Sequence, residues 1–445
     1  MSSLHTSITR SGRALAFVAL LSAAAFAAPP AAPSGPLPRP LTLDQALIYA
    51  AEHNPTLRRV REQIREQEGI VLQAGARRIP NVEAAGSYGR VDDELVAAPG
   101  YDNESWSFQV TANQVLYAGG SLRAGTRAAR EQAEAARLAF QAQLHDTLLA
   151  TRQAFASVLL DRELIAVQEE AIAVLEAELA NARARREAGT GSDFDVIRAE
   201  VAVANAQPPL IQARNAYRIA QDQLRQQLGA PASVEDAPTD LGVEGTLSDR
   251  GDMVSLGAAL DTAHARRPEL RRQLRLVTAA DHNVTVAKSG RLPTVSAYAG
   301  YEWASAAASA RLADRRDGWM AGINSNWAIF DGRATAGKVR QARSQATQTR
   351  LAQEELALAI DVEVRQAHSA LTEANELVAA STKTVEQAQE SLRLARARQQ
   401  AGTATQLDVL SAQSALTLAR STQSQARYAF TVALAGLQRA IGSTP

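Results

Sequence analysis

The chain has 445 residues, no cysteine, and 47 acidic and 47 basic residues. Its formal net charge of zero argues against a nucleic-acid-binding protein, which needs a basic excess on one surface. Alanine is abundant and aromatic residues make up 4% of the chain, a composition that favours long, closely packed helices over a bulky globular core.

The N-terminus has the pattern of a secretory signal peptide. Arg10 and Arg13 precede the apolar run at residues 14–27, which ends in an A-x-A motif. This run is too short to span a membrane as a helix, and no later segment approaches the ~18 consecutive apolar residues that a transmembrane helix needs. We expect residues 1–27 to be a signal peptide and the Pro/Ala-rich residues 28–40 to be an extended linker.

An internal duplication organises the rest of the chain. Pro55 and Pro268 are 213 positions apart, and seven further pairs of landmark residues have the same separation. A repeat of this length is too long for a solenoid unit. We therefore expect two similar modules, the first at residues 41–253 and the second at residues 254–445.

Each module opens with a helical pattern that contains a proline, which either starts a new helix or kinks the first one. The hydrophobic period then changes to two residues in two segments, at 82–88 and 106–113 in the first module. The matching segments of the second module are 294–303 and 319–327. We predict amphipathic β-strands, each about long enough to cross a bilayer when tilted.

A glycine turn follows the second strand of each module, at Gly119 and Gly120 in the first and at Gly332 in the second. The helical pattern of the first module then continues without a proline from residue 122 to residue 188, which is about 100 Å at the helical rise per residue. One apolar stripe of this long helix ends at Glu178.

A return helix is predicted at residues 193–228, and its counterpart at residues 406–441. Pro208 and Pro209 should break the first return helix, whereas Ser421 and Thr422 at the matching positions should not. Residues 230–253, rich in proline, glycine and acidic side chains, are expected to join the two modules.

Four amphipathic strands in one chain cannot close a barrel, for which about eight are the minimum. An open sheet edge cannot face lipid, because its unpaired backbone groups would each cost several kcal/mol. If the strands lie in a membrane, the chain must therefore form an oligomer.

The duplicated order of helix, two strands, long helix, turn and return helix resembles that of the outer-membrane factors of the TolC family. The resemblance covers the chain after the linker. Four motifs carry it together with this order: Tyr117-Ala118-Gly119-Gly120, Phe330-Asp331-Gly332, Ala188-Gly189-Thr190 with Asp195, and Ala401-Gly402-Thr403 with Asp408.

The resemblance implies an α+β membrane protein. Four β-strands per chain would contribute to a shared twelve-stranded outer-membrane β-barrel of a homotrimer, and the long antiparallel helical hairpins would form a periplasmic tunnel. It further implies an outer-membrane location, a periplasmic adaptor and an inner-membrane pump as partners, and contact with outer-membrane lipid.

The hairpin tips are the candidate gate of such a tunnel. Asp195 and Asp408 lie three residues after Ser192 and Thr405, so both pairs resemble capping boxes. In a trimer the two aspartates would also place six carboxylates around one axis, an arrangement that attracts cations. The two roles can coexist. The candidate tip residues are Gly189, Thr190, Asp193, Asp195, Gly402, Thr403 and Asp408.

This chain departs from the family pattern at the second tip. Ser411 stands where a second carboxylate is expected, and Gln399 and Ala404 replace the tyrosine and arginine of the usual clamp.

Large aromatic side chains lie on the apolar faces of the predicted strands. We expect them to face lipid, because the opposite faces carry mostly Asn, Gln, Ser and Thr. The alternative is that they form the core of a soluble sandwich. The residues are Trp106, Phe108, Tyr301, Trp303, Trp319 and Trp327.

The histidines show no metal-ligand spacing, and neither a phosphate loop nor a Ser/His/Asp arrangement on a strand-turn-helix elbow is present. We predict no metal site, no cofactor, no nucleic-acid partner and no enzymatic activity. The favoured function is passive conduction of exported molecules in a tripartite efflux or type I secretion system. The alternative is a secreted periplasmic coiled-coil scaffold or adhesin, which would have no reason to alternate aromatic and polar residues at bilayer length.

Overall fold

The computed structural model describes residues 37, 39–96, 100–230, 240–251 and 254–443. The predicted signal peptide and most of the predicted linker lie outside these residues. None of the helices in the described part carries an apolar stretch long enough for a membrane span.

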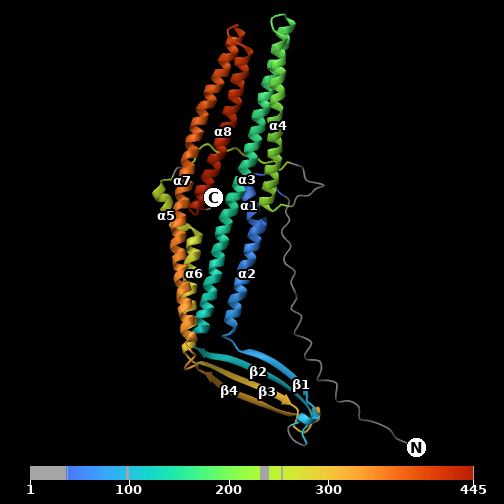
Figure 1. Ribbon diagram of the computed structural model, residues 1–445, viewed down its shortest axis with the longest axis vertical. Helices are drawn as coiled ribbons and strands as arrows, with labels where there is room; N and C mark the ends of the chain where they lie inside the picture. Colours follow the sequence, from blue (N-terminus) through green and yellow to red (C-terminus); the bar gives the residue numbers. More distant parts are fainter. Residues whose placement is uncertain (1–36, 38, 97–99, 231–239, 252–253, 444–445) are drawn as a thin grey trace, which may run out of the picture. The chain divides into compact units, whose positions relative to one another are not determined.

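The two halves contain the same elements in the same order, and each helix of the second half begins 213 residues after its counterpart (Figure 1). The first half comprises α1 (Leu43–His53), α2 (Pro55–Ala76), β1 (Asn81–Arg90), β2 (Glu104–Ala118), α3 (Ser121–Glu187) and α4 (Asp193–Leu228). The second half comprises α5 (Leu256–Arg266), α6 (Pro268–Lys288), β3 (Thr294–Ala304), β4 (Arg316–Asn326), α7 (Ala334–Gln400) and α8 (Gln406–Ala440). Short 3-10 turns are η1 (Asp93–Leu95), η2 (Ser289–Arg291) and η3 (Leu312–Asp314).

The opening helix of each half is divided by its proline. Pro55 and Pro268 are the first residues of α2 and α6, where a missing backbone N–H costs nothing because that group has no helical partner. Asn54 caps α2 by accepting hydrogen bonds from the backbone N–H groups of Thr56 and Leu57, at 2.8 and 3.3 Å. Of the two alternatives that the sequence left open, a new helix is the one adopted.

The predicted break at Pro208 and Pro209 is wrong, since α4 continues through both residues from Asp193 to Leu228. Each proline removes one helical hydrogen bond, a local effect. The whole 36-residue helix packs along α3 and buries Leu210 directly after the prolines. Continuous packing of α4 therefore outweighs the two missing bonds.

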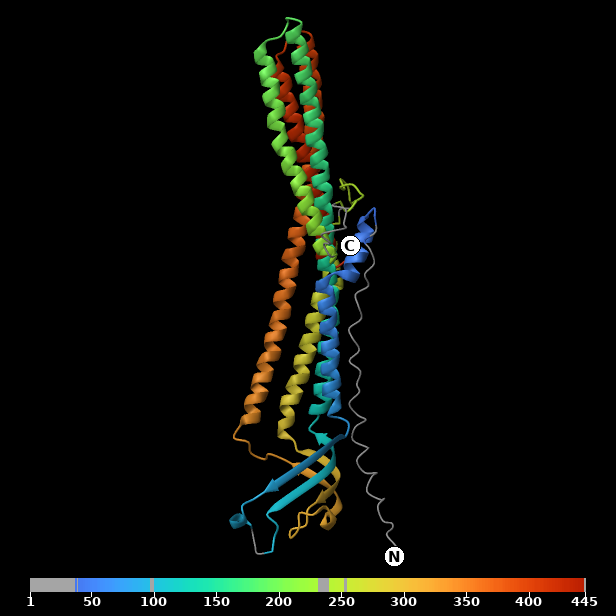
Figure 2. The ribbon, with the colours of Figure 1, turned by 90° about the vertical axis from the view of Figure 1, so that its right-hand side faces the viewer.

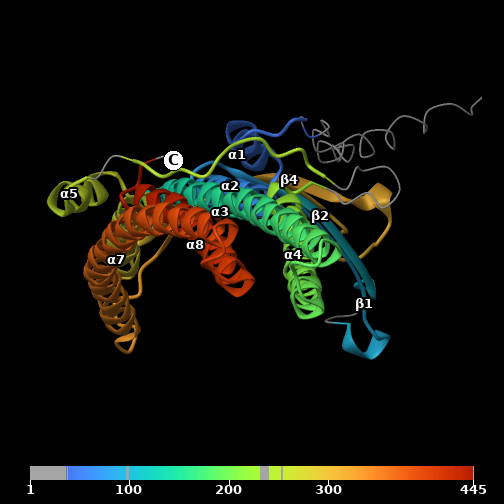
Figure 3. The same cartoon turned by 90° about the horizontal axis from the view of Figure 1, so that it is seen from above.

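The helices form a row in the half that adjoins the strands. There α2 packs on α3, α3 on α6, and α6 on α7. Beyond this row, α4 pairs with α3, while α8 lies beside both α7 and α3 (Figure 3). The strands join the helix ends opposite the hairpin turns (Figure 2). The first hairpin, α3 and α4, and the second, α7 and α8, therefore meet mainly through α3 and α8.

The segment between the halves contributes to the core. Leu241, Val243 and Leu247 are buried with side chains of α1, α3 and α4. Leu41 pairs with Val243 in a parallel bridge, and Leu37 packs against the same cluster. The residues that connect the modules, and the end of the predicted linker, thus help to hold α1 against the first hairpin.

The four strands form one antiparallel sheet in the order β1-β2-β3-β4. The central pair joins the two halves, because β2 pairs with β3 over most of its length. A bulge between Val115 and Tyr117 shifts the register where β2 approaches α3. Strands β1 and β4 are left as free edges, so the backbone groups on their outer sides have no strand partner within the described chain.

Candidate functional site

Both hairpins turn at a glycine after the long helix. Gly189 and Gly402 have φ values of +73° and +74°, which L side chains rarely adopt. The Thr190 N–H donates to the Arg185 carbonyl at 2.9 Å, and the Thr403 N–H donates to the Arg398 carbonyl at 2.8 Å. These bonds close a Schellman motif at each helix end, as expected for glycine at this position.

The return helices start with complete capping boxes. The Ser192 hydroxyl accepts from the Asp195 N–H at 3.2 Å, and the Asp195 carboxylate accepts from the Ser192 N–H at 3.4 Å. The same pair of bonds joins Thr405 and Asp408, at 3.3 and 2.8 Å. The capping interpretation of both aspartates is confirmed.

The other charged tip residue, Asp193, is largely exposed and lies 3.6 Å from the Arg186 guanidinium. The Asp408 carboxylate has a pKa below its ordinary value, because the Thr405 backbone N–H and then its hydroxyl donate hydrogen bonds to the charged form. Asp408 therefore stays ionised over the physiological pH range, as a fixed negative charge at the second tip.

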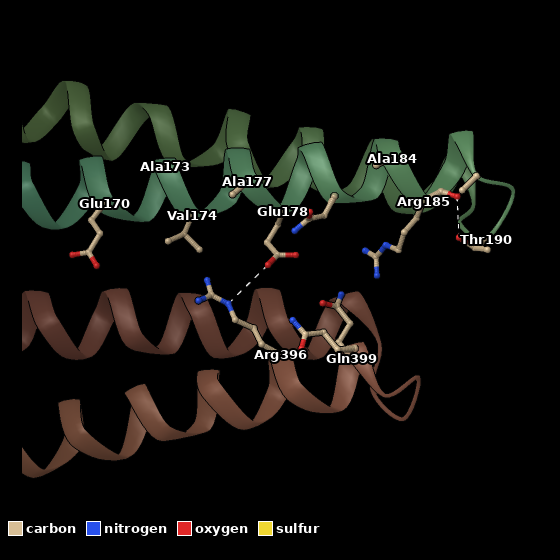
Figure 4. Close-up of a pocket in the computed structure, with 13 residues that line it drawn as sticks. Glu170, Ala173, Val174, Ala177, Glu178, Ala184, Arg185, Thr190, Arg396 and Gln399 are labelled. Atoms are coloured by element: carbon tan, nitrogen blue, oxygen red, sulfur yellow. Dashed lines mark hydrogen bonds and ion pairs between the residues drawn. The ribbon is translucent and has the colours of Figure 1, made fainter.

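Behind the tips, a cavity of about 900 Å³ separates α3 from α7 (Figure 4). Glu178 of α3 and Arg396 of α7 point toward each other across it, with Glu178 Oε1 3.9 Å from Arg396 Nε. A second ion pair, Glu170–Arg420 at 2.5 Å, also links the first hairpin to the second.

The polar atoms around this cavity are incompletely paired. Glu178 is 7% exposed, and its Oε2 has no hydrogen-bond partner among the residues that the structure describes. Within the same part of the chain, Arg396 Nε and Gln399 Nε2 also lack hydrogen-bond partners, since 3.9 Å is too long for a hydrogen bond between Arg396 and Glu178. Buried polar groups without hydrogen-bond partners are costly, so the unpaired atoms weaken the contact between the two hairpins at this cavity.

Sequence reasoning did not select Glu170, Glu178, Arg396 or Arg420. A signal was present for Glu178, because a carboxylate stands where the apolar stripe of the long helix would continue. Its partner could not be found in this way, since Arg396 lies on a different helix of the other half.

The glycine turns between sheet and helix have the expected backbone. Gly119, Gly120 and Gly332 have φ values of +59°, +85° and +62°. A Cβ atom on Gly119 would lie 2.9 Å from the Ser289 carbonyl oxygen, so this turn also allows the two halves to approach closely. Arg333 occupies the position equivalent to Gly120 and keeps a left-handed φ of +73°.

The register of the sheet places the predicted aromatic residues on one face. Phe108 pairs with Trp303, and Tyr301 pairs with Trp319. The ring centroids of Tyr301 and Trp303 are 4.6 Å apart. Directly paired residues share a face, so these side chains form one continuous aromatic surface, with Trp319 79% exposed.

Two of the predicted aromatic residues have further roles. Trp106 belongs to the same face, and its indole N–H donates to the Ala310 carbonyl at 2.9 Å, which ties β2 to the loop after β3. Trp327 follows the last residue of β4, and its indole N–H donates to the Arg291 carbonyl at 3.2 Å. Both tryptophans thus anchor the ends of the sheet.

The opposite face of the sheet is polar. Glu83 pairs with Thr111, and Gln109 pairs with Glu302. One apolar and one polar face on a sheet with free edges fits a wall between lipid and water. Among the described residues, no group of three or more histidine, aspartate or glutamate side chains could hold a metal ion.

Comparison with known proteins agrees with this arrangement. The chain is 27% identical over 401 residues to the outer membrane efflux protein BepC of Brucella suis, covering 90% of this chain and 85% of that protein. It is 29% identical over 336 residues to protein CyaE of Bordetella pertussis, covering 74% of this chain and 69% of that protein.

The fold resembles the crystal structure of the Campylobacter jejuni CmeC outer membrane channel, with a TM-score of 0.78 at 15% identity over 90% of this chain and 85% of that one. The profile of the outer membrane efflux protein family matches twice, at residues 47–230 and 259–443. The chain therefore belongs to the outer membrane efflux protein family.

Proposed function

We propose that the protein is the outer-membrane exit channel of an export system that spans the cell envelope, and that it conducts exported molecules passively. The observation that carries this proposal is the four-stranded sheet with one aromatic face, one polar face and two free edges. The family consists of channel proteins, which favours conduction over the scaffold or adhesin and over an enzyme.

The free edges require further copies of the chain. In a membrane, the outer backbone groups of β1 and β4 need partners, because lipid supplies none. Pairing β4 of one copy with β1 of the next satisfies both edges, and this head-to-tail contact can close into a ring. With four strands per chain, three copies exceed the roughly eight strands of the smallest barrels.

The helical row supports the same closure. Its two ends are α2 and α7, which come from opposite halves of the chain just as β1 and β4 do. Both ends expose aliphatic side chains: Ile70 and Leu72 on α2, and Leu351, Leu358 and Val362 on α7. A ring of three chains would bury these side chains between neighbouring copies, so we propose a homotrimer.

In this arrangement the sheet lies in the outer membrane and the helices extend into the periplasm. The hairpin tips, at the opposite ends of the helices from the sheet, would then meet a periplasmic adaptor and an inner-membrane pump, which supplies the energy.

Membrane fractionation and the native mass of the detergent-extracted protein test the proposal. We expect a species of three chains in the outer-membrane fraction. A periplasmic monomer or dimer would contradict the channel and favour a helical scaffold.

We further propose that Asp195 and Asp408 make the tip cation-selective. The double variant Asp195→Asn with Asp408→Asn removes the charges but keeps an oxygen that can cap each helix. We expect it to lower the cation selectivity measured from the reversal potential of planar bilayers in a KCl gradient. The matched control, Ser192→Ala with Thr405→Ala, weakens the caps and should retain the selectivity. Unchanged selectivity in the asparagine variant would remove the aspartates from the gate.

A further inference from the structure

A second cavity, of about 430 Å³, lies between α3, α4 and α8 at the level of Pro208 and Pro209. Its walls combine aliphatic residues such as Leu175, Leu410 and Leu418 with polar but uncharged residues. No charged side chain is among the described residues that line it. This neutral lining is unlike that of the cavity behind the tips, which contains glutamate and arginine.

Two of the three hydroxyl side chains that line this cavity, Thr417 and Ser421, already donate their hydrogens to backbone carbonyls. The Ser421 hydroxyl donates to the Thr417 carbonyl at 3.0 Å, and the Thr417 hydroxyl donates to the Gln413 carbonyl at 3.0 Å. A hydroxyl has one hydrogen to donate and two lone pairs to accept with. Toward a molecule in the cavity, both side chains therefore act as acceptors.

Gln413 adds an acceptor without a partner. It lines the cavity, is 5% exposed, and donates from Nε2 to the Thr417 hydroxyl at 3.5 Å. Its Oε1 has no hydrogen-bond partner within the described residues. Gln413 also lines the adjoining cavity between α3, α7 and α8. An unpaired, buried amide oxygen is costly, and a donor that reaches it would remove this cost.

The two prolines leave further acceptors in α4. Pro209 has no backbone N–H, so the Asn205 carbonyl cannot make its normal helical bond to that residue. Asn205 and Pro209 both line the cavity. On α8 the positions equivalent to Pro208 and Pro209 are Ser421 and Thr422, which retain their N–H groups. The proline pair thus leaves the α4 backbone beside this cavity with a carbonyl group that has lost its normal helical donor, a loss that α8 does not share.

We propose that this cavity binds a small neutral molecule with an apolar body and one hydrogen-bond donor, such as a phenol, with the donor paired to Gln413 Oε1. The aliphatic walls fit the body, and the volume is in the usual range of small-molecule sites, about 300–1,000 Å³. A charged ligand is disfavoured, because the lining offers no counter-charge for it.

Binding of 2-naphthol to the full-length protein, held in amphipol, tests this site by equilibrium dialysis against protein-free amphipol. We expect saturable binding of one molecule per chain. The matched compound 2-methoxynaphthalene has the same body without the donor and should bind about tenfold more weakly. Equal affinity for the two compounds, or the absence of saturable binding, would by itself overturn the proposal.

Two variants and one control locate the site. Gln413→Leu should bring the affinities for the two compounds together. The control Gln212→Leu, at an exposed position of α4, should leave the preference for 2-naphthol unchanged. Ala206→Trp fills the cavity and should abolish saturable binding. A preference that survives Gln413→Leu, or binding that survives Ala206→Trp, would place the ligand elsewhere and overturn the assignment. These results do not depend on conduction, so they are separable from the proposed channel function.

Discussion

Each half bonds the start of its second helix, α2 or α6, to the end of its return helix, α4 or α8. The two halves use different side chains at these two junctions. In the first half, Asn54 donates from Nδ2 to the Gln227 carbonyl at 2.7 Å. At the equivalent position of the second half, Arg267 donates to the Ala440 carbonyl at 3.3 Å, and Ala440 is itself the equivalent of Gln227. Asn54 and Arg267 are 5% and 3% exposed, so both junctions are buried.

The second junction also contains a network of charges. Arg267 donates to Glu269 at 2.8 Å and to Glu363 at 2.6 Å. Arg439 donates to Asp146 of α3 at 2.8 Å and is hydrogen-bonded to Glu363 as well. The fold thus requires a donor that reaches the end of the return helix, and it accepts either a neutral amide or a guanidinium whose charge is balanced.

The largest effect should come from removing the buried guanidinium. Arg267→Met leaves Glu269 and Glu363 with Arg439 as their remaining arginine partner, and breaking ion pairs that have one fully buried member costs up to about 3–5 kcal/mol. We expect a clear loss of stability in denaturant unfolding followed by circular dichroism. The control Arg271→Met changes an exposed arginine of α6, the helix that Arg267 precedes, and should have little effect. If both variants were equally stable, the charge network would not hold the junction.

Substitution of the glycine at the end of each return helix should destabilise the two junctions to different extents. A Cβ atom on Gly229 would lie 2.6 Å from the His53 carbonyl oxygen, and one on Gly442 would lie 3.0 Å from the Arg267 nitrogen. Both residues have left-handed φ values, +73° and +71°. Gly229→Ala should therefore cost about 2–4 kcal/mol and Gly442→Ala less.

The control for the glycine variants is Gly436→Ala, because nothing lies within 4 Å of a Cβ atom there and the residue is inside α8. It should be neutral or slightly stabilising. The measurement is the thermal midpoint of each variant. A Gly442→Ala variant less stable than Gly229→Ala would reverse the order expected from the contacts.

A smaller loss is expected at the neutral junction. Asn54→Ala removes the cap of α2 and the bond to Gln227, which should cost about 1–2 kcal/mol. Asn54→Asp keeps the capping oxygen but has no N–H to donate, so it should isolate the bond to the return helix. The comparison of urea midpoints decides between the two contributions. A loss as large as that of Arg267→Met would mean that charge adds nothing at the second junction.

The smallest predicted effect is on how the stability of the folded protein falls at acidic pH, and it arises at the second junction. Burial by itself raises the pKa of Glu269, but the hydrogen bond from Arg267 and the charges of Arg267 and Arg439 bring it below the ordinary value of 4.5. A carboxylate with a lowered pKa in the folded protein stabilises it above about pH 4.5, and this contribution is lost as the pH falls through the folded-state value.

Glu269→Gln should therefore weaken the fall in stability below pH 4.5, measured as the unfolding midpoint against pH. The other charged and titratable groups at this junction are the same in the wild type and in the variant. They are Glu363 of α7, Arg439 of α8, and Asp146 and His145 of α3. Parallel curves for the wild type and Glu269→Gln would show that Glu269 does not carry the acid dependence.

Local patterns determined most of the secondary structure. The 213-residue offset, the change of hydrophobic period and the glycine turns predicted the element order, and the return helix at residues 193–228 matches α4. The capping boxes at Ser192 and Thr405 were also predictable, because both bonding partners lie within three residues of each other. These features depend on neighbouring residues, which a sequence displays directly.

Only the tertiary structure decided the rest. The continuity of α4 through Pro208 and Pro209 depends on its packing against α3, which outweighs a local rule. The Glu178–Arg396 pair and the Arg267 network join residues from different helices, brought together by the order in which α3, α6, α7 and α8 pack. The cavity beside Gln413 likewise exists only where α4 and α8 lie against α3. Contacts between distant parts of a chain follow from packing, and no local period records them.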